Sequence, residues 1–350
     1  MSHSALQSVK RFTQIKANVP GLRLPPLPTP RDLLNLYRLQ ARKQLSQNFL
    51  LDSRITDKIA KAAGNIQGGD VCEVGPGPGS ITRSILKRDP GRVLVIEKDH
   101  RFLPFLEILR EATQERLHII LGDVLALEMS KMFREELRMQ WEDRCPNIHL
   151  IGNLPFSVST PLIIRWLKDI SLKRNAWSYG RVRMTLTFQK EVAERLVADI
   201  NTKQRNRLSV MCQNWCDAKH VSTIPGSAFV PPPDVDVGVV TLRPKIEPVI
   251  EEDFDLVDKV TRQMTIFRQK RCIRCAGTLF PAYQRDDLSN RLLHLAEVNP
   301  DTRPYQLTLD EFRRLVLAFK HLCQENPKLH KLVVHATNYL ERIKLLACSV

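Results

Sequence analysis

Short apolar segments alternate with amphipathic segments along the first two thirds of the chain. Four apolar runs predict strands, at residues 71–75, 93–97, 117–123 and 148–156. The segments between or before them predict helices, at residues 54–64, 80–88 and 102–112. Two further strands are predicted at residues 182–189 and 237–244. Strands that alternate with helices indicate βαβ units around a buried parallel sheet, and hence an α/β domain.

A further helix is predicted after the fourth strand. Thr160 and Pro161 have the character of an N-cap and a first-turn proline. Apolar residues follow them at helical spacing: Leu162, Ile163, Trp166, Leu167 and Ile170. We therefore expect this helix to begin at Pro161.

The pattern changes near residue 246. Apolar residues recur there at helical spacing, around residues 256–267 and 288–295. Thr308 and Glu311 form a capping box ahead of a third segment of this kind. The sequence thus predicts a leading segment at residues 1–30 and an α/β domain at residues 31–245. A small helical domain follows at residues 246–350, and the sequence does not decide whether its tail is ordered.

Composition and charge narrow the class of protein. The 350 residues are 43% hydrophobic, enough for a core, and no apolar run reaches the roughly 18 residues of a membrane-spanning helix. The net charge of +15 favours a polyanionic partner such as nucleic acid, with a merely basic protein as the alternative. Basic residues near the first helix of the helical domain predict either phosphate contacts or a solvated face: Arg262, Arg268, Lys270, Arg271 and Arg274.

The start of the chain has a distinct composition. Residues 1–31 hold five basic residues and no acidic one, which is typical of a mitochondrial transit peptide. A disordered basic arm is the alternative. The proline-rich residues 24–30 indicate a stiff boundary before the folded chain.

The eight cysteines show no repeating spacing. Cys272 and Cys275 form a lone CxxC pair, and no further ligands complete a zinc site. We therefore predict free thiols and no metal.

A glycine-rich run, CEVGPGPGS at residues 72–80, lies where a strand turns into a helix. Its glycines let a ligand lie against the backbone, but the GxGxG spacing differs from the GxGxxG of dinucleotide-binding proteins. Glu97 ends the second strand, where a carboxylate can accept hydrogen bonds from ribose hydroxyls. Asp123 ends the third, where an acceptor can meet an amino group of a base. Because ligands of parallel sheets bind at the carboxyl ends of strands, the pattern predicts a nucleotide-like cofactor.

The fourth strand ends in the run GNLPF. Asn153 offers a side-chain acceptor and Leu154 a backbone carbonyl, while Pro155 has no N–H and Phe156 offers a flat aromatic face. An unstacked base with an amino group requires such acceptors beside an aromatic ring. An ordinary turn with a packed Phe is the alternative.

Several runs together resemble the small-subunit ribosomal RNA adenine dimethyltransferases, and with the transit-like start they are most similar to the mitochondrial members. The runs are QNFLLD (47–52), EVGPGPG (73–79), IEKD (96–99), GDV (122–124), GNLPFSVSTPL (152–162), FQKEVAERL (188–196), RLSVM (207–211) and AFVPPPDVDVGVV (228–240). The resemblance implies a Rossmann-like S-adenosylmethionine-dependent methyltransferase domain followed by a small helical, RNA-contacting domain. It also implies N6-dimethylation of two adjacent adenosines in the hairpin near the 3′ end of the small-subunit RNA.

The resemblance assigns roles by motif. The implied S-adenosylmethionine-binding residues are Asn48, Leu50, Gly75, Glu97, Lys98, Asp123, Val124 and Asn153. Catalysis falls to the run Asn153, Leu154, Pro155 and Phe156, and Phe156 and Phe229 are expected to stack on the two faces of the flipped adenine. Phe156 replaces the Tyr of many relatives, which keeps the stacking face and removes one hydrogen-bonding group.

Three functions are alternatives to ribosomal RNA dimethylation. A non-catalytic nucleic-acid-binding factor in mitochondrial transcription or ribosome assembly would use the fold only for binding, although it would not need the intact cofactor residues. The glycine spacing disfavours an NAD-linked oxidoreductase, and the later motifs disfavour a DNA adenine methyltransferase. We expect a monomer of the mitochondrial matrix that acts on the assembling small ribosomal subunit.

Overall fold

A computed structural model describes residues 25–39, 41, 47–326 and 329. The chain divides into two compact units. The first comprises the chain up to Val197 together with Trp215–Ile246, and the second comprises Ala198–Asn214 together with the chain from Glu247 onward. Most of the predicted transit peptide (residues 1–24) and most of the C-terminal tail lie outside the described residues.

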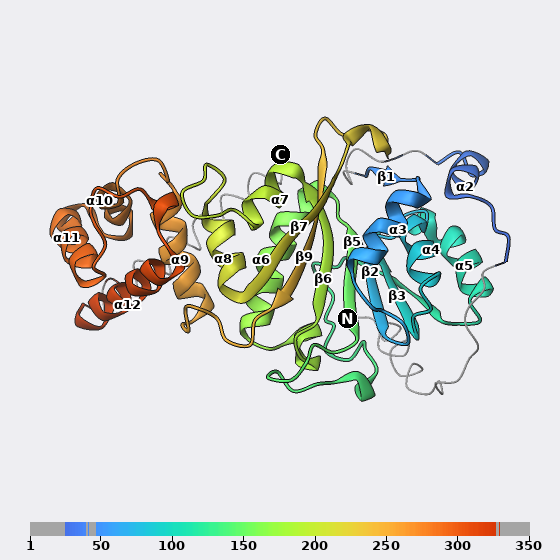
Figure 1. Cartoon of the computed structure of the whole chain (residues 1–350), viewed down its shortest axis with the longest axis horizontal. Coiled ribbons are helices and arrows are strands. Elements are labelled where there is room, and N and C mark those ends of the chain that lie inside the picture. The colour runs from blue at the N-terminus through green and yellow to red at the C-terminus, as the bar shows by residue number, and fades with distance from the viewer. Residues whose placement is uncertain (1–24, 40, 42–46, 327–328, 330–350) are drawn as a thin grey trace. The chain divides into compact units, whose positions relative to one another are not determined.

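A sheet forms the centre of the first unit (Figure 1). In order across the sheet, its described strands are β4 (Leu117–Leu121), β3 (Arg92–Glu97), β2 (Asp70–Val74), β5 (Ile148–Asn153), β6 (Arg183–Gln189), β9 (Val237–Pro244) and β7 (Cys216–Ile224). The strands from β4 to β6 run parallel to their neighbours, whereas β9 runs antiparallel to both β6 and β7. The predicted strands are therefore present in a mostly parallel sheet, which confirms the fold class.

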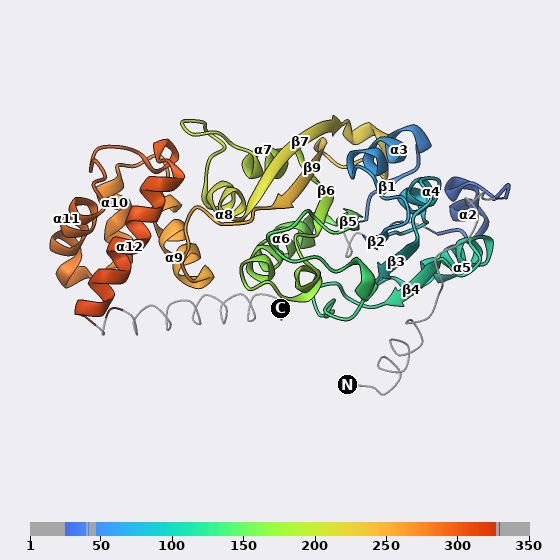
Figure 2. The same cartoon turned by 60° about the horizontal axis from the view of Figure 1, so that its bottom comes forward.

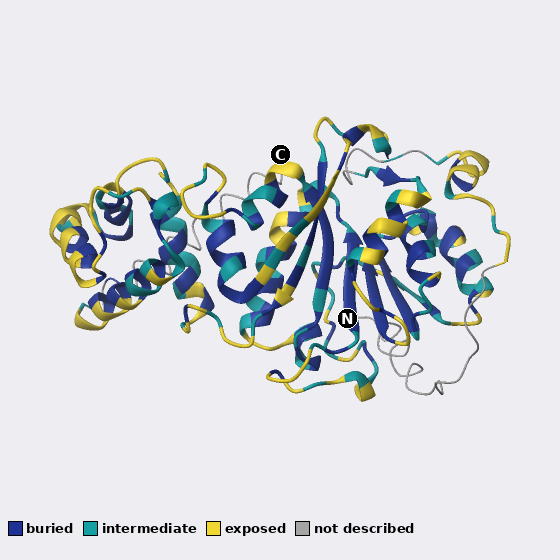
Figure 3. Cartoon of the chain, in the orientation of Figure 1, coloured by how far each residue is buried: buried dark blue, intermediate teal, exposed yellow. Residues whose placement is uncertain are grey.

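Helices cover this sheet. The described ones in the first unit are α2 (Pro30–Leu36), α3 (Ser53–Ala62), α4 (Ser80–Leu86), α5 (Leu103–Ala112), α6 (Phe156–Ser171) and α7 (Lys190–Leu196). Ile59 of α3, Ile85 of α4 and Leu106 of α5 pack in one core cluster with Val71 and Val93 of the sheet. Since β2 and β3 are covered, they are buried at every position, which explains their continuous apolar runs (Figure 3).

The helix after β5 begins earlier than predicted. α6 starts at Phe156, directly after Pro155, so Pro161 lies inside the helix and not in its first turn. Proline has no amide N–H, and the helix therefore lacks the hydrogen bond to the carbonyl of Ser157. Burial of Leu162 and Trp166 on the covered face keeps the helix continuous past this point.

The predicted domain division needs one correction. The boundary after residue 245 lies one residue from that of the structure, but Ala198–Asn214 groups with the helical unit. This segment includes most of α8 (Arg207–Trp215). Arg205 Nε donates to the carbonyl of Leu307 at 3.2 Å, and the Asn214 side chain forms two hydrogen bonds with the backbone of Ile250. Hydrogen bonds to residues distant in sequence thus place Ala198–Asn214 in the helical unit.

The second unit is helical, as the sequence predicted. Its further described helices are α9 (Phe254–Thr265), α10 (Cys272–Ala276), α11 (Arg285–Leu295) and α12 (Leu309–Glu325) (Figure 2). The predicted capping box is present: Thr308 Oγ1 accepts from Glu311 N, and Glu311 Oε2 accepts from Thr308 N. Phe312 and Phe319 of α12 are buried in the core. Across the described chain, no helix has the length and apolarity that a bilayer crossing requires.

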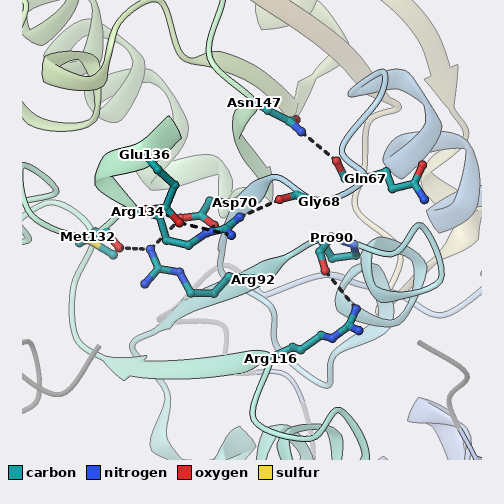
Figure 4. Close-up of polar contacts among 10 residues, drawn as sticks. All are labelled: Gln67, Gly68, Asp70, Pro90, Arg92, Arg116, Met132, Arg134, Glu136 and Asn147. Carbon is teal, nitrogen blue, oxygen red and sulfur yellow. Dashed lines mark hydrogen bonds and ion pairs between the residues drawn. The ribbon is translucent and has the colours of Figure 1, made fainter. Parts of the chain in front are cut away.

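A buried ionic cluster lies at the amino end of β2 (Figure 4). The Asp70 carboxylate is fully buried and pairs with Arg92 Nη2 at 2.7 Å and with Arg134 Nε at 2.6 Å. Arg92 also donates to the carbonyl of Met132, and Arg134 donates to the carbonyl of Gly68. The cluster thereby fastens the long connection between β4 and β5 to the sheet, at the end of β2 opposite Gly75.

Candidate active site

A cavity of about 650 Å³, part of it open to solvent, lies at the carboxyl ends of β2, β3 and β5. β2 is placed between β3 and β5, so the chain crosses over in opposite directions on its two sides, and ligands of such sheets bind at this point. The lining residues are Gln47, Asn48, Phe49, Leu50, Gly75, Pro76, Gly77, Pro78, Ser80, Ile81, Glu97, Asn153, Leu154, Pro155, Phe156 and Phe229.

The glycine-rich turn forms the floor of this cavity. Gly75, Gly77 and Gly79 all have positive φ angles, of 69°, 54° and 80°. L-residues with a side chain rarely adopt this conformation, which explains the three glycines. At Gly79 a Cβ atom would also lie 2.6 Å from a methyl carbon of Leu109. The turn therefore exposes bare backbone where α4 begins.

Glu97 closes β3 with both carboxylate oxygens engaged. Oε2 accepts from the N–H of Gly77 at 2.9 Å, and Oε1 accepts from the N–H of Asp99 at 2.8 Å. Burial raises the pKa of Glu97, and these backbone donors oppose the rise. A carboxylate has about four lone-pair sites, more than these donors use, so the side chain is oriented and still able to accept a hydrogen bond from a ligand.

Asn153, at the end of β5, has its side-chain amide held at both ends. Nδ2 donates to the carbonyl of Asn48 at 3.0 Å, and Oδ1 accepts from Thr187 Oγ1 at 2.7 Å. Thr187 lies directly opposite Asn153 in the register of β5 and β6. The amide group therefore has one defined orientation at the cavity wall.

Two phenylalanines add aromatic surface to the wall. Phe156 begins α6, whereas Phe229 belongs to the two-residue strand β8 (Phe229–Val230). β8 pairs antiparallel with β1 (Phe49–Leu50), so that Leu50 lies opposite Phe229. This small ladder joins the segment before α3 to the segment before β9 and closes the cavity on that side.

Three predicted cofactor residues do not line this cavity: Lys98, Asp123 and Val124. Lys98 Nζ pairs with Asp123 Oδ2 at 2.9 Å, and this hydrogen bond lowers the pKa of Asp123. Val124 is buried next to it in the chain. The other predicted site residues are all brought together in the cavity wall.

The sequence patterns did not single out the residues that hold the segment before α3, residues 47–50, in place. Gln47 lines the cavity and donates to Asp99 Oδ2 at 3.0 Å. Burial raises the pKa of Asp99, but hydrogen bonds from Arg101 and Gln47 outweigh this effect and lower the pKa to about 2. Gln47 belongs to the run QNFLLD and Asp99 to the run IEKD, and membership of these family-like runs was the one indication in the sequence that they matter. Nothing in the sequence singled out Thr187.

Comparison with known proteins decides the family. Residues 38–316 match the family model described as ribosomal RNA adenine dimethylase. The chain belongs to the ribosomal RNA adenine dimethylase family. It is 54% identical over 322 residues to "Dimethyladenosine transferase 1, mitochondrial" of Homo sapiens, with 92% of each chain covered, and 50% identical to the protein of that name from Xenopus tropicalis, again with 92% of each covered.

Two solved structures share the fold of this rRNA adenine dimethylase. A dimethyladenosine transferase from Plasmodium falciparum aligns with a TM-score of 0.58 at 23% identity, covering 77% of this chain and 96% of that one. The 23S rRNA methyltransferase ErmE aligns with a TM-score of 0.55 at 20% identity, covering 78% and 100%. The predictions of an adenine dimethyltransferase and of S-adenosylmethionine as its cofactor are confirmed by the family.

Proposed function

We propose that this dimethylase acts in the mitochondrial matrix on two adjacent adenosines in the hairpin near the 3′ end of the small-subunit ribosomal RNA. The observation that carries this substrate is an aromatic and amide-lined part of the cavity wall, formed by Asn153, Leu154, Phe156 and Phe229. The mitochondrial names of the relatives and the basic, acid-free start support the location. The charge of +15 supports an RNA partner.

The cavity suits S-adenosylmethionine. Gly75 presents bare backbone to the methionine part, since its φ of 69° disfavours any residue with a side chain. The oriented carboxylate of Glu97 would accept from the ribose hydroxyls, with Asn48 and Leu50 on the entry side. We assign the adenine end to Lys98, Asp123 and Val124, beyond the wall of the cavity.

For methyl transfer, the main task of the protein is to position the adenine N6 and the methyl group. The bound cofactor supplies an activated methyl group, but the adenine N6 lone pair is delocalised into the ring. Asn153 Oδ1 and the carbonyl of Leu154 would accept from the N6 protons and direct the nitrogen, so that geometry and electrostatics carry the rate. Phe156 and Phe229 would stack on the base, each contact being worth roughly 1–3 kcal/mol.

Replacing Glu97 by Gln tests the cofactor assignment. We expect the Kd for S-adenosylmethionine to rise about tenfold to a hundredfold, because a hydrogen bond to a charged group contributes about 1.5–3 kcal/mol. Isothermal titration calorimetry measures the change. The matched control is Glu107→Gln on α5, where the carboxylate pairs with Arg110 at a partly exposed site away from the cavity. Equal affinities of the two variants would contradict the role of Glu97.

Methyl transfer to RNA tests the proposed function itself. Labelled S-adenosylmethionine is incubated with the protein and a hairpin from the 3′ end of the small-subunit RNA, and the nucleosides are analysed by mass spectrometry. We expect N6,N6-dimethyladenosine from the native hairpin and none when both adenosines are replaced by guanosine. RNA binding without any product, from protein that binds the cofactor, would instead favour the non-catalytic nucleic-acid-binding factor.

A further inference from the structure

Thr187 carries a hydroxyl where the fold does not require one. It lies near the carboxyl end of β6 and is fully buried, and a β-branched side chain suits a strand in this position. Valine would satisfy the same packing without a polar group. The hydroxyl costs free energy to bury unless it forms a hydrogen bond, and its partner is Asn153 Oδ1 at 2.7 Å.

This hydrogen bond completes the orientation of the Asn153 amide. A carbonyl oxygen can only accept, so the contact at 3.0 Å with the carbonyl of Asn48 requires the NH₂ group on that side. Oδ1 must then face β6, where the hydroxyl of Thr187 donates to it. An amide oxygen has two lone pairs, and Thr187 occupies one, which fixes the direction of the other.

We propose that Thr187 is a positioning residue for methyl transfer: it holds Asn153 Oδ1 so that the free lone pair meets the N6 amine of the target adenosine. The inference rests on the proposed function, because it assumes that Asn153 receives this amine. Thr187 itself does not line the cavity, so we expect it to touch neither substrate nor cofactor. Its loss therefore acts on the rate of the chemical step and leaves the binding of RNA and cofactor in place.

The substitution Thr187→Val removes the hydroxyl and keeps the shape. We expect kcat to fall about tenfold to a hundredfold, as for a small misplacement of an aligned group, with the KM values for RNA and cofactor unchanged. Thr187→Ser keeps the hydroxyl but leaves a gap in the core, so it is expected to be less stable than the Val variant and yet more active. A purely structural role would give the opposite order, with activity following stability.

Thr185→Val is the matched control. Thr185 is also buried on β6, two residues earlier and therefore on the same face of the strand, and lies opposite Ile151 and not opposite Asn153. We expect Thr185→Val to keep the wild-type kcat. Full kcat in Thr187→Val, or an equal loss in Thr187→Ser, would overturn the inference while leaving dimethylation by the wild type intact.

A second measurement does not depend on the RNA substrate. The side-chain amide of Asn153 is followed by NMR in protein labelled at asparagine, and its signal is assigned by its loss in Asn153→Ala. We expect the signal to shift and its protons to exchange faster in Thr187→Val, but not in Thr187→Ser or Thr185→Val. An unchanged signal in Thr187→Val would overturn the inference even if the wild type proved inactive on the hairpin.

Discussion

Replacing Asn153 by alanine is expected to lower kcat for methyl transfer by about 10²–10³-fold, the loss typical when one preorganised hydrogen-bonding group is removed from an active site. The substitution deletes the side-chain acceptor proposed for the N6 amine, whereas the carbonyl of Leu154 and the two phenylalanines remain. The RNA should still bind, because phosphate contacts dominate its affinity. Single-turnover kinetics with the hairpin RNA, at saturating cofactor, measures the chemical step directly.

The control for this substitution is Asn290→Ala. Asn290 lies on α11 in the helical unit, where its side chain donates to the carbonyl of Asp286 at an exposed position. We expect this variant to methylate RNA at the wild-type rate. If Asn153→Ala also kept the wild-type single-turnover rate, the role of the NLPF run in the chemistry would be refuted.

Replacing Asp70 by alanine is expected to destabilise the first unit by about 3–5 kcal/mol, because the removal of one partner leaves buried charges without compensation. Asp70 is fully buried, and the side chains of Arg92 and Arg134 are only 7% and 16% exposed, so water has little access to either guanidinium. Urea unfolding followed by circular dichroism should show a lower midpoint. Asp70→Asn, which keeps the shape, should be intermediate.

A surface ion pair provides the control for Asp70. Arg243 Nη2 and Asp217 Oδ2 lie 2.8 Å apart, a distance like those in the buried cluster, but the side chains are 59% and 50% exposed. Exposed pairs contribute about 0–1 kcal/mol, so Asp217→Ala should unfold close to the wild-type midpoint. An equally small effect of Asp70→Ala would show that the buried cluster does not stabilise the first unit.

The core of the site could be predicted because it follows the strand order. Gly75, Glu97 and Asn153 each directly follow or end an apolar run, and parallel strands bring such positions to one edge of the sheet. The helical unit was predictable for a similar reason, since its helices bury one face and repeat apolar residues at helical spacing. Both features could be predicted because the spacing of apolar residues within each short segment shows whether it is a strand or a helix.

Other features depend on contacts that no local pattern records. Phe229 was assigned only through the family resemblance, because the ladder that brings it to Leu50 is two residues long on each side. β7 was missed because most of its positions are not fully buried and its sequence, CDAKHVSTI, lacks a regular apolar alternation. Thr187 was missed because a threonine in a strand is unremarkable until its hydrogen-bond partner is known.

The ladder between β1 and β8 also bears on how the enzyme is made. The glycine-rich turn and Glu97 precede Phe229 by more than a hundred residues, and a chain leaves the ribosome from its N-terminus. A nascent chain that stops short of Phe229 lacks the strand that pairs with Leu50, and with it one wall of the cavity. We therefore expect the proposed cofactor cavity to be completed only after Phe229 has been made, and shorter N-terminal fragments to bind S-adenosylmethionine poorly even where their strands have already formed.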